Sequence, residues 1–186
     1  GGDETTMEKD LANARQIHMI GIGGAGMCAL ARIFLQMGYR VTGSDNNESD
    51  NLARIRKEGA LVHMGHAPDQ LEGADLVVYS AAILPDNPEL LEAKKKGIAV
   101  MTRAQALGEL SRMHRQVVAV SGTHGKTTTT SMICEILCHA GRDFTAVVGG
   151  YLPCLGGNGR LGAQQLMVCE ACEFADTYLS LKRDTA

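Results

Sequence analysis

Residues 121–128 have the sequence Ser-Gly-Thr-His-Gly-Lys-Thr-Thr and lie between the apolar run Val117–Val120 and a long helical pattern. A buried strand that leads into a glycine-rich turn at a helix N-terminus points several backbone N–H groups at one spot, where the helix dipole also favours an anion. Lys126 adds a cation for the outer phosphates and Thr127 a hydroxyl for Mg²⁺. Because the general pattern has glycine where this chain has Val120, the sequence predicts a variant P-loop. The alternative is a turn that begins a helix and binds nothing.

A second glycine-rich loop lies near the N-terminus. Residues 21–26 have the sequence Gly-Ile-Gly-Gly-Ala-Gly and directly follow a predicted strand, and Asp45 ends the next predicted strand. This is the context of a dinucleotide-binding loop, in which glycines permit close approach of a diphosphate and an acidic residue binds a ribose hydroxyl. The pattern alone does not distinguish NAD, FAD and a nucleotide sugar. A tight packing turn without a ligand is the alternative.

The composition is that of an ordinary globular chain. The 186 residues are 45% hydrophobic and 4% aromatic and carry a net charge of −3, which predicts one or two small domains with an aliphatic core. Without a block dense in Lys and Arg, we expect no nucleic-acid partner. Without an apolar stretch of membrane-spanning length or a leader pattern, we expect neither membrane insertion nor secretion. Most of the six cysteines lie in apolar patterns, as in a protein of the reducing cytoplasm.

Short apolar strands alternate with amphipathic helices along the first part of the chain, and this predicts an α/β fold. The polar residues 1–14 are left out of the fold. We expect a Rossmann-like, doubly wound parallel sheet over residues 15–113. Its predicted strands are 17–20, 39–43, 60–63, 76–79 and 98–101. Its predicted helices are 26–37, 51–58, 88–96 and the connecting helix 103–113.

The pattern begins again at residue 114 with the start of a P-loop α/β domain over residues 114–186. We expect strands at 116–120, 144–148 and 166–168, a helix at 126–139, and a glycine-rich connection at 149–162. Three strands are few for a P-loop domain. The sequence therefore predicts a truncated, partial ATP-binding domain.

An NAD(P)-dependent oxidoreductase is the first functional hypothesis for a dinucleotide-binding loop. A hydride-transferring enzyme has no use for the P-loop, however. Two phosphate-binding loops favour an enzyme that brings the γ-phosphate of ATP to a second, diphosphate-bearing molecule. A non-enzymatic nucleotide-binding module remains as another alternative.

Four stretches together carry a family resemblance. They are Gly21–Met27 (GIGGAGM), Gly43-Ser44-Asp45, Tyr79–Ile83 with Asn87-Pro88-Glu89, and Gly122–Thr130 (GTHGKTTTT). In this order and register, the chain from about residue 16 to 181 resembles the Mur ligases of bacterial peptidoglycan synthesis. The resemblance is strongest to the members that use UDP-N-acetylmuramate and L-alanine. It also accounts for the presence of Val120 where the general P-loop pattern has glycine.

The resemblance implies a cytoplasmic, ATP-dependent ligase of cell-wall synthesis, with ATP and Mg²⁺ as cofactors. The lactyl carboxylate of UDP-N-acetylmuramate takes the γ-phosphoryl group, the amine of L-alanine attacks the acyl phosphate, and phosphate leaves. As a fragment of such an enzyme, the chain is not expected to be active alone. Its oligomeric state is left open.

The resemblance also implies which residues bind the sugar nucleotide. The diphosphate is assigned to Gly23, Gly24, Ala25 and Gly26. The uridine is assigned to Ser44, Asp45, Ser80 and Ala81. His66 is a further candidate for a uracil contact, and Asn158 and Arg160 match a second substrate loop of the family.

For ATP the implied residues are Gly122, Thr123, His124, Gly125, Lys126, Thr127 and Thr128. Thr127 and Glu170 match positions that serve Mg²⁺, and the implied catalytic residues are Lys126, Glu170 and His124. Many relatives have a carboxylate where this chain has Cys172, so no metal role is assigned to that position. A buried small side chain is the favoured interpretation of Cys172 over a reactive thiol.

Overall fold

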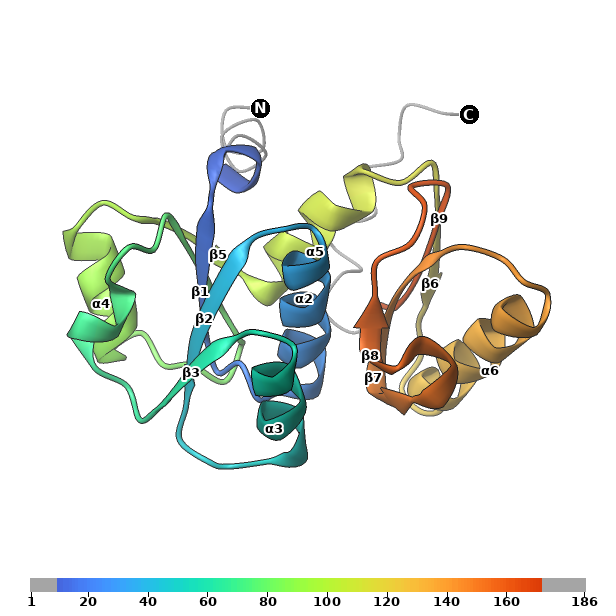
Figure 1. Cartoon of the computed structure of the whole chain (residues 1–186), viewed down its shortest axis with the longest axis horizontal. Coiled ribbons are helices and arrows are strands. Elements are labelled where there is room, and N and C mark those ends of the chain that lie inside the picture. The colour runs from blue at the N-terminus through green and yellow to red at the C-terminus, as the bar shows by residue number, and fades with distance from the viewer. Residues whose placement is uncertain (1–9, 172–186) are drawn as a thin grey trace. The chain divides into compact units, whose positions relative to one another are not determined.

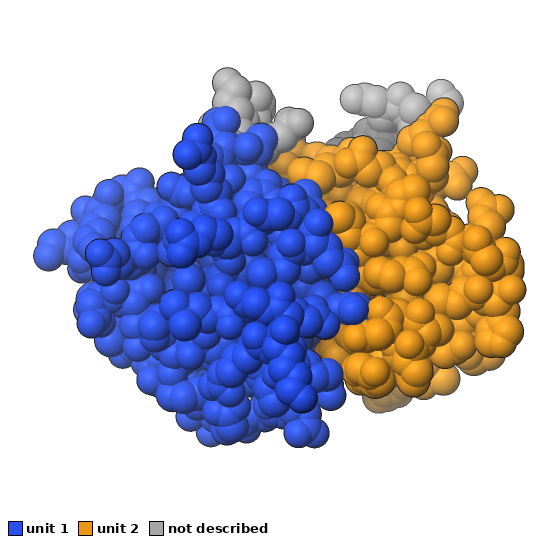
Figure 2. All heavy atoms as spheres, viewed as in Figure 1, with its two compact units in different colours: residues 1–103 blue, residues 104–186 orange. Residues whose placement is uncertain are grey.

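The structure is a computed structural model that describes residues 10–171. The chain divides into two compact units, residues 1–103 and 104–186, which Figure 2 distinguishes by colour. The predicted connecting helix is α5 (Arg103–Arg112), and all but its first residue belong to the second unit. The predicted domain boundary at residue 113 lies after the end of α5, whereas the two units divide at its first residue.

The first unit contains a five-stranded parallel sheet with the order β3-β2-β1-β4-β5 (Figure 1). Its strands are β1 (Gln16–Ile20), β2 (Arg40–Asp45), β3 (Leu61–Met64), β4 (Leu76–Tyr79) and β5 (Ala99–Thr102). In the central strand β1, Ile17 pairs with Val41 of β2 and Leu76 of β4. The predicted doubly wound parallel sheet is confirmed.

Helices cover both faces of this sheet (Figure 1). One face carries α2 (Ala25–Gln36) and α3 (Asp50–Lys57), and the other carries α4 (Pro88–Lys95) with the short 3₁₀ helix η1 (Pro68–Leu71). Two of the helix starts have side-chain caps, because Ser49 accepts a hydrogen bond from Leu52 N and Asn87 accepts from Glu89 N and Leu90 N. Pro88 occupies the first turn of α4, where its missing N–H costs nothing.

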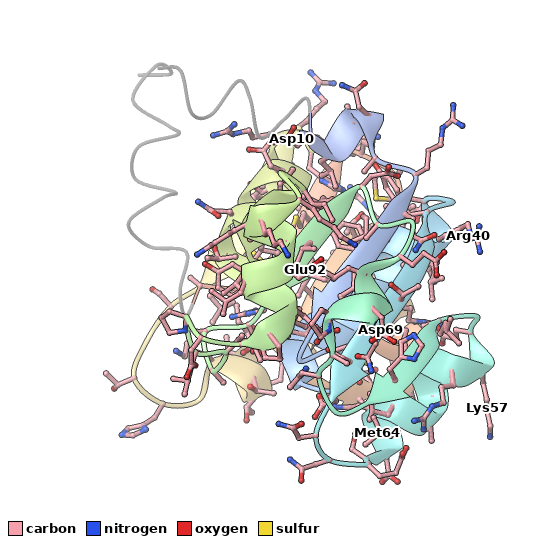
Figure 3. The ribbon with its side chains drawn as sticks, turned by 90° about the vertical axis from the view of Figure 1, so that its left-hand side faces the viewer. Asp10, Arg40, Lys57, Met64, Asp69 and Glu92 are labelled. Carbon is pink, nitrogen blue, oxygen red and sulfur yellow. The ribbon has the colours of Figure 1, made fainter. Side chains whose placement is uncertain are left out.

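The core of the first unit is aliphatic, as the composition predicts. Ile17, Met19 and Ile20 of β1 are fully buried. Leu71, Val77, Leu90 and Ala93 pack with Ile20 on the α4 side. Arg40 and Lys57 are exposed, and Figure 3 shows both side chains extending away from the ribbon.

The exclusion of residues 1–14 from the fold was wrong for its last part. Residues 10–13 are helical, and Leu11 is fully buried. The Tyr39 hydroxyl donates a hydrogen bond to the Leu11 carbonyl at 2.7 Å. The prediction considered only the overall polarity of residues 1–14. One buried leucine can nevertheless attach a mostly polar segment to the fold.

The second unit contains a four-stranded sheet with the order β6-β9-β7-β8. Its strands are β6 (Gln116–Val120), β7 (Thr145–Leu152), β8 (Gly157–Arg160) and β9 (Leu166–Glu170). The strands β6, β9 and β7 are parallel, and β8 is antiparallel to β7. Helix α6 (Lys126–His139) spans the predicted residues.

The glycine-rich segment 149–162 was wrongly expected to be a connection between strands. Strand β7 continues to Leu152, the 3₁₀ helix η2 (Pro153–Leu155) follows, and the chain returns as β8. Gly156 has φ +71°, a left-handed conformation that reverses the chain direction without a Cβ penalty. Glycine has a low strand propensity, so the sequence pattern did not indicate a strand here.

Apolar residues of α6, β7, η2 and β9 form the core of the second unit. Cys134, Phe144, Ala146, Val148 and Val168 are its fully or almost fully buried members. The structure contains, within residues 10–171, no helix that is long and apolar enough to span a bilayer.

Candidate functional site

The loop after β1 is fixed against the end of β2. The N–H groups of Gly21 and Ile22 donate to the Ser44 carbonyl at 2.8 and 3.2 Å, and Gly23 N donates to Asp45 Oδ2 at 2.9 Å. A Cβ on Gly23 would lie 2.7 Å from that carboxylate oxygen, so glycine is required for this approach. The loop ends at Gly24, which precedes the first residue of α2. Its backbone therefore lies against the strand ends, as a diphosphate-binding loop requires.

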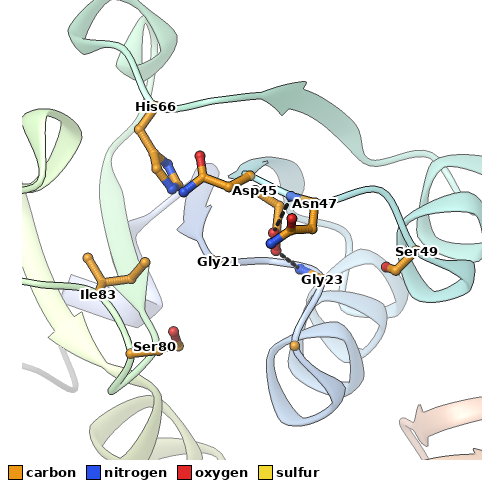
Figure 4. A pocket seen from close by; sticks show the side chains of 11 residues that line it. Gly21, Gly23, Asp45, Asn47, Ser49, His66, Ser80 and Ile83 are labelled. Carbon is orange, nitrogen blue, oxygen red and sulfur yellow. Dashed lines mark hydrogen bonds between the residues drawn. The ribbon is translucent and has the colours of Figure 1, made fainter.

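An open pocket of about 380 Å³ lies at this loop (Figure 4). It is lined by Gly21, Gly23, Gly24, Asp45, Asn46, Asn47, Ser49, His66, Ser80, Ala82 and Ile83. The lining comes from the carboxyl ends of β1, β2, β3 and β4. Because helices follow β1 and β4 on opposite faces of the sheet, this is the crevice in which doubly wound sheets bind ligands.

The structure brings five of the predicted substrate residues to the pocket, namely Gly23, Gly24, Asp45, His66 and Ser80. Ala25, Gly26, Ser44 and Ala81 are not among the described residues that line it. Gly26 instead packs against Arg103, because a Cβ on it would lie 2.5 Å from Nη1 of that guanidinium. The third glycine of this loop therefore serves close packing.

Sequence reasoning missed several lining residues that follow β2 and β4. Asn46, Asn47 and Ser49 lie after β2, and Asn47 N donates to Asp45 Oδ1 at 3.2 Å. Ala82 and Ile83 lie after β4. Their position directly after two parallel strands is the signal that could have identified them, since loops at the carboxyl ends of strands form this crevice.

A buried polar network adjoins the pocket and was also missed. The Glu89 carboxylate on α4 is fully buried and is hydrogen-bonded to His18 Nε2 at 2.7 Å, Ser44 Oγ at 2.5 Å and His66 Nδ1 at 2.7 Å. Burial raises the pKa of Glu89, but the hydrogen bonds from His18, Ser44 and His66 outweigh burial and hold it below its usual value. Glu89 is therefore an ionised carboxylate at neutral pH.

In the second unit, β6 leads through an exposed loop into α6. Gly122 has φ +141°, and Gly125, the residue before the first residue of α6, has φ +74°. A residue with a Cβ is strained in such conformations. Lys126 is the first residue of α6, so the N–H groups of Lys126, Thr127 and Thr128 have no partner within the helix. His124 is an exposed residue of the same loop. This is the strand, turn and helix arrangement predicted for the P-loop.

Helix α6 and strands β7 and β9 meet beside this loop, through Thr127, Gly149 and Glu170 respectively. Glu170 pairs with Val120 at the carboxyl ends of β9 and β6 and accepts a hydrogen bond from Gly149 N at 2.9 Å. A Cβ on Gly149 would lie 3.0 Å from both Glu170 Oε1 and Thr127 Oγ1. The predicted Mg²⁺ ligands Thr127 and Glu170 thus approach the same point. Among residues 10–171 no group of three or more His, Cys, Asp or Glu side chains could hold a metal ion.

Asn158 and Arg160 lie on strand β8, where a substrate loop was expected. Asn158 is buried, and its Oδ1 has no hydrogen-bonding partner within the described part of the chain. The Arg160 guanidinium lies over the Phe144 ring at 4.7 Å from its centroid. Arg160 therefore has a packing role in addition to any ligand contact.

Cys169 and Cys172 have the C-x-x-C spacing of redox and metal motifs. Cys169 is fully buried in β9, whereas Cys172 lies outside the described residues.

Comparisons with known proteins identify relatives of this chain. The chain is 48% identical over 168 residues to UDP-N-acetylmuramate--L-alanine ligase of Aquifex aeolicus, covering 90% of this chain and 37% of that relative. It is 46% identical over 165 residues to the ligase of the same description from Clostridium perfringens, covering 89% of this chain and 36% of that relative. The chain thus spans little more than a third of the length of the curated relatives it matches.

Solved structures show the same fold. The crystal structure of UDP-N-acetylmuramate-alanine ligase MurC from Thermotoga maritima matches with a TM-score of 0.79 and 34% identity, over 83% of this chain and 37% of that chain. UDP-N-acetylmuramate:L-alanyl-gamma-D-glutamyl-meso-diaminopimelate ligase from Neisseria meningitides matches with a TM-score of 0.77 and 30% identity, over 84% of this chain and 52% of that chain.

The family model described as "Mur ligase family, catalytic domain" matches residues 16–115. That range holds the five-stranded sheet, its glycine-rich loop and the pocket. Sequence, fold and the position of the pocket lead to one assignment: this chain belongs to the Mur ligase family.

Proposed function

We propose that this chain is part of an ATP-dependent ligase of peptidoglycan synthesis that joins L-alanine to the carboxylate of UDP-N-acetylmuramate, with ADP and phosphate released. The proposal rests on the relatives, which are UDP-N-acetylmuramate--L-alanine ligases and are longer than the chain. The reducing cytoplasm is the proposed location, in keeping with the free cysteines of the described residues.

The pocket of the first unit carries the proposal. Helix α2 begins at Ala25 directly after the glycine loop, and the N–H groups of its first turn have no partner within the helix. Together with Asp45 and Ser80 of the pocket, this helix start suits a diphosphate linked to a ribose. We assign the sugar nucleotide to the residues predicted from the sequence. Of these, Gly23, Gly24, Asp45, His66 and Ser80 line the pocket, whereas Ala25, Gly26, Ser44, Ala81, Asn158 and Arg160 are proposed on the family pattern alone.

The loop at residues 122–128 is proposed to bind the phosphates of ATP. Thr127 and Glu170 fit Mg²⁺, because a hydroxyl and a carboxylate converge where Gly149 has no Cβ, and hard oxygen ligands suit this ion. Bound Mg²⁺ would neutralise phosphate charge. Phosphate oxygens and water complete the coordination of Mg²⁺ in many such sites, so two protein ligands are sufficient.

The reaction proceeds by two transfers. An oxygen of the lactyl carboxylate attacks the γ-phosphorus and the bond to ADP breaks, which gives an acyl phosphate. The neutral amine of L-alanine then attacks the acyl carbon, loses a proton, and phosphate leaves. Lys126 and the loop N–H groups offset the repulsion between the two anions, and His124 donates a hydrogen bond to a phosphate or the substrate.

The second unit has the surface of an incomplete domain. On α6, Met132 and Ile136 are 61% and 66% exposed, and Val118 of the parallel strand β6 is 40% exposed. Parallel sheets and their helices are normally covered on both sides. We infer that further protein covers these apolar side chains in the active enzyme and that the chain alone does not catalyse.

A nicotinamide-dependent oxidoreductase is not favoured, since the relatives are ligases and the P-loop has no role in hydride transfer. A non-enzymatic nucleotide-binding module likewise leaves the relatedness to ligases unexplained. No feature of the described residues favours either alternative over a ligase.

Calorimetric titration of the chain with UDP-N-acetylmuramate, and separately with NADH, tests the proposal. We expect binding of the sugar nucleotide and none of NADH. Gly23→Ala, whose Cβ would lie 2.7 Å from Asp45 Oδ2, should abolish binding. Gly150→Ala is the matched control, because a Cβ there has nothing within 4 Å. Binding of NADH without the sugar nucleotide would reverse the assignment.

A further inference from the structure

The environment of Glu89 determines where protons lie in the network beside the pocket. Four groups face this carboxylate, namely His18 on β1, Ser44 on β2, His66 after β3 and Gln70 on η1. In the amide orientation that satisfies both of its polar atoms, Gln70 donates to Glu89 Oε1 at 3.0 Å and to the Gly65 carbonyl at 3.1 Å. Because a carboxylate only accepts hydrogen bonds, every one of its partners must donate to it.

This requirement assigns the proton of each partner. His18 donates through Nε2, so its Nδ1 accepts from the Thr42 hydroxyl at 2.7 Å. The single proton of Ser44 is directed to Glu89 Oε2 at 2.5 Å. The Ser44 oxygen, 2.8 Å from His66 Nδ1, is then an acceptor. Both neighbours of His66 Nδ1 are therefore acceptors, and the proton of this ring must be on Nδ1.

The opposite ring nitrogen is the one available to a ligand. His66 lines the pocket, and its Nε2 has no hydrogen-bonding partner among residues 10–171. In a neutral imidazole with its proton on Nδ1, Nε2 carries a lone pair. The other tautomer would set a lone pair of Nδ1 2.7 Å from the Glu89 carboxylate, which is repulsive.

We propose that Glu89 is a positioning residue that keeps His66 in the Nδ1-protonated form, so that His66 Nε2 accepts a hydrogen bond from an N–H or O–H group of the bound nucleoside. This inference rests on the proposed function for its ligand, since a uridine offers one imide N–H and two ribose hydroxyls. The protonation state of His66 is a property of the free protein and does not depend on that function.

Long-range ¹H–¹⁵N correlation spectra of the imidazoles in the ¹⁵N-labelled chain, without ligand at neutral pH, test the protonation state. We expect a protonated Nδ1 and an unprotonated Nε2 for His66, and a mixture of tautomers in Glu89→Gln. Glu92→Gln is the control, as it changes the same helix at an ion pair with Lys96. A wild-type His66 protonated on Nε2 would overturn the inference, and that spectrum decides even if Glu89→Gln fails to fold.

Calorimetric titration with UDP tests the ligand contact. We expect Glu89→Gln and His66→Ala each to weaken UDP binding about fivefold to tenfold, the equivalent of one ordinary hydrogen bond. Glu92→Gln should bind as the wild type does. Equal affinity of all four proteins would overturn the contact. If the wild type does not bind UDP, the proposed function fails, and the spectra still decide the role of Glu89.

Discussion

The Glu89 carboxylate and the His18 imidazole are both fully buried and lie 2.7 Å apart, which joins helix α4 to the central strand β1. Exposed ion pairs are screened by water and contribute little to stability. A buried charge that loses a partner is instead left without compensation. This pair is therefore expected to matter for the stability of the first unit.

Replacing Glu89 by Gln should lower the free energy of unfolding of the first unit by about 1–3 kcal/mol at neutral pH, because the amide cannot accept from all of the donors that face the carboxylate. The folded-state pKa of Glu89 is lowered, so its contribution is complete above the unfolded value of about 4.3 and is lost as pH falls through the folded-state value. The difference between wild type and Glu89→Gln should thus shrink in acid. Hydrogen exchange of the β1 amides in urea, at neutral and acidic pH, measures it.

Glu92→Gln serves as the control for this measurement. Its ion pair with Lys96 is partly exposed at 3.5 Å, so the change should cost less than about 1 kcal/mol. A loss for Glu89→Gln that is no larger than this, or that does not depend on pH, would contradict the stabilising role of the buried carboxylate.

Gly43 and Gly24 should respond differently to alanine. A Cβ on Gly43 would lie 2.6 Å from Ile22 Cδ1 and 2.8 Å from the Met19 carbonyl oxygen, whereas one on Gly24 meets only ordinary contacts from 3.6 Å. We expect Gly43→Ala to destabilise the first unit by about 1–3 kcal/mol through overpacking. Gly24→Ala should leave stability nearly unchanged and weaken UDP binding, because it narrows the pocket loop. Urea unfolding and calorimetry separate the two effects, and equal stability losses would contradict this distinction.

Much of the fold could be predicted because the strands of a parallel sheet are short apolar runs separated by helices with clear ends. Strands β4 and β6 and helix α6 have the predicted bounds. Strand β8, with the sequence Gly-Asn-Gly-Arg, could not be predicted. Its stability comes from pairing with β7, a tertiary contact that local propensity does not contain.

The candidate site was predictable where a motif specifies the backbone and less so where side chains meet across elements. The loops at Gly23 and Gly125 follow from glycine spacing. The contact of Glu89 with His18 joins residues 71 positions apart, and nothing in the local sequence indicates it. The motif Asn87-Pro88-Glu89 indicated the family but not the partners of Glu89.

Gly149→Ala should impair binding of Mg²⁺ and ATP. The added Cβ would lie 3.0 Å from Thr127 Oγ1 and from Glu170 Oε1, so both oxygens must move apart. We expect at least a tenfold weaker affinity for Mg²⁺-ATP, measured by titration of the full-length enzyme. Gly150→Ala is the neighbouring control, since its Cβ has nothing within 4 Å. Equal affinity of the two variants would show that Thr127 and Glu170 do not act together.

Cys138 on α6 and Cys154 on η2 lie with their sulfur atoms 2.9 Å apart as free thiols. Burial, together with the hydrogen bond from Cys138, raises the pKa of Cys154 to about 12. Since the thiolate is the nucleophile in disulfide exchange, little of the Cys154 thiol is reactive at neutral pH.

Oxidised glutathione should therefore join Cys138 and Cys154 slowly at neutral pH and faster as the pH rises. Each disulfide removes two hydrogen atoms from the thiols, and two glutathione molecules are released in the reduced form. Closing a loop of this length should stabilise the second unit by about 2–3 kcal/mol, because the cross-link restricts the unfolded chain.

Mass spectrometry of the digested protein identifies the bond between Cys138 and Cys154, and urea unfolding measures the gain in stability. Cys138→Ser prevents the reaction, whereas Cys28→Ser, which changes a buried thiol of the first unit, should not. Oxidation that forms other pairs first would contradict the proximity of these two thiols.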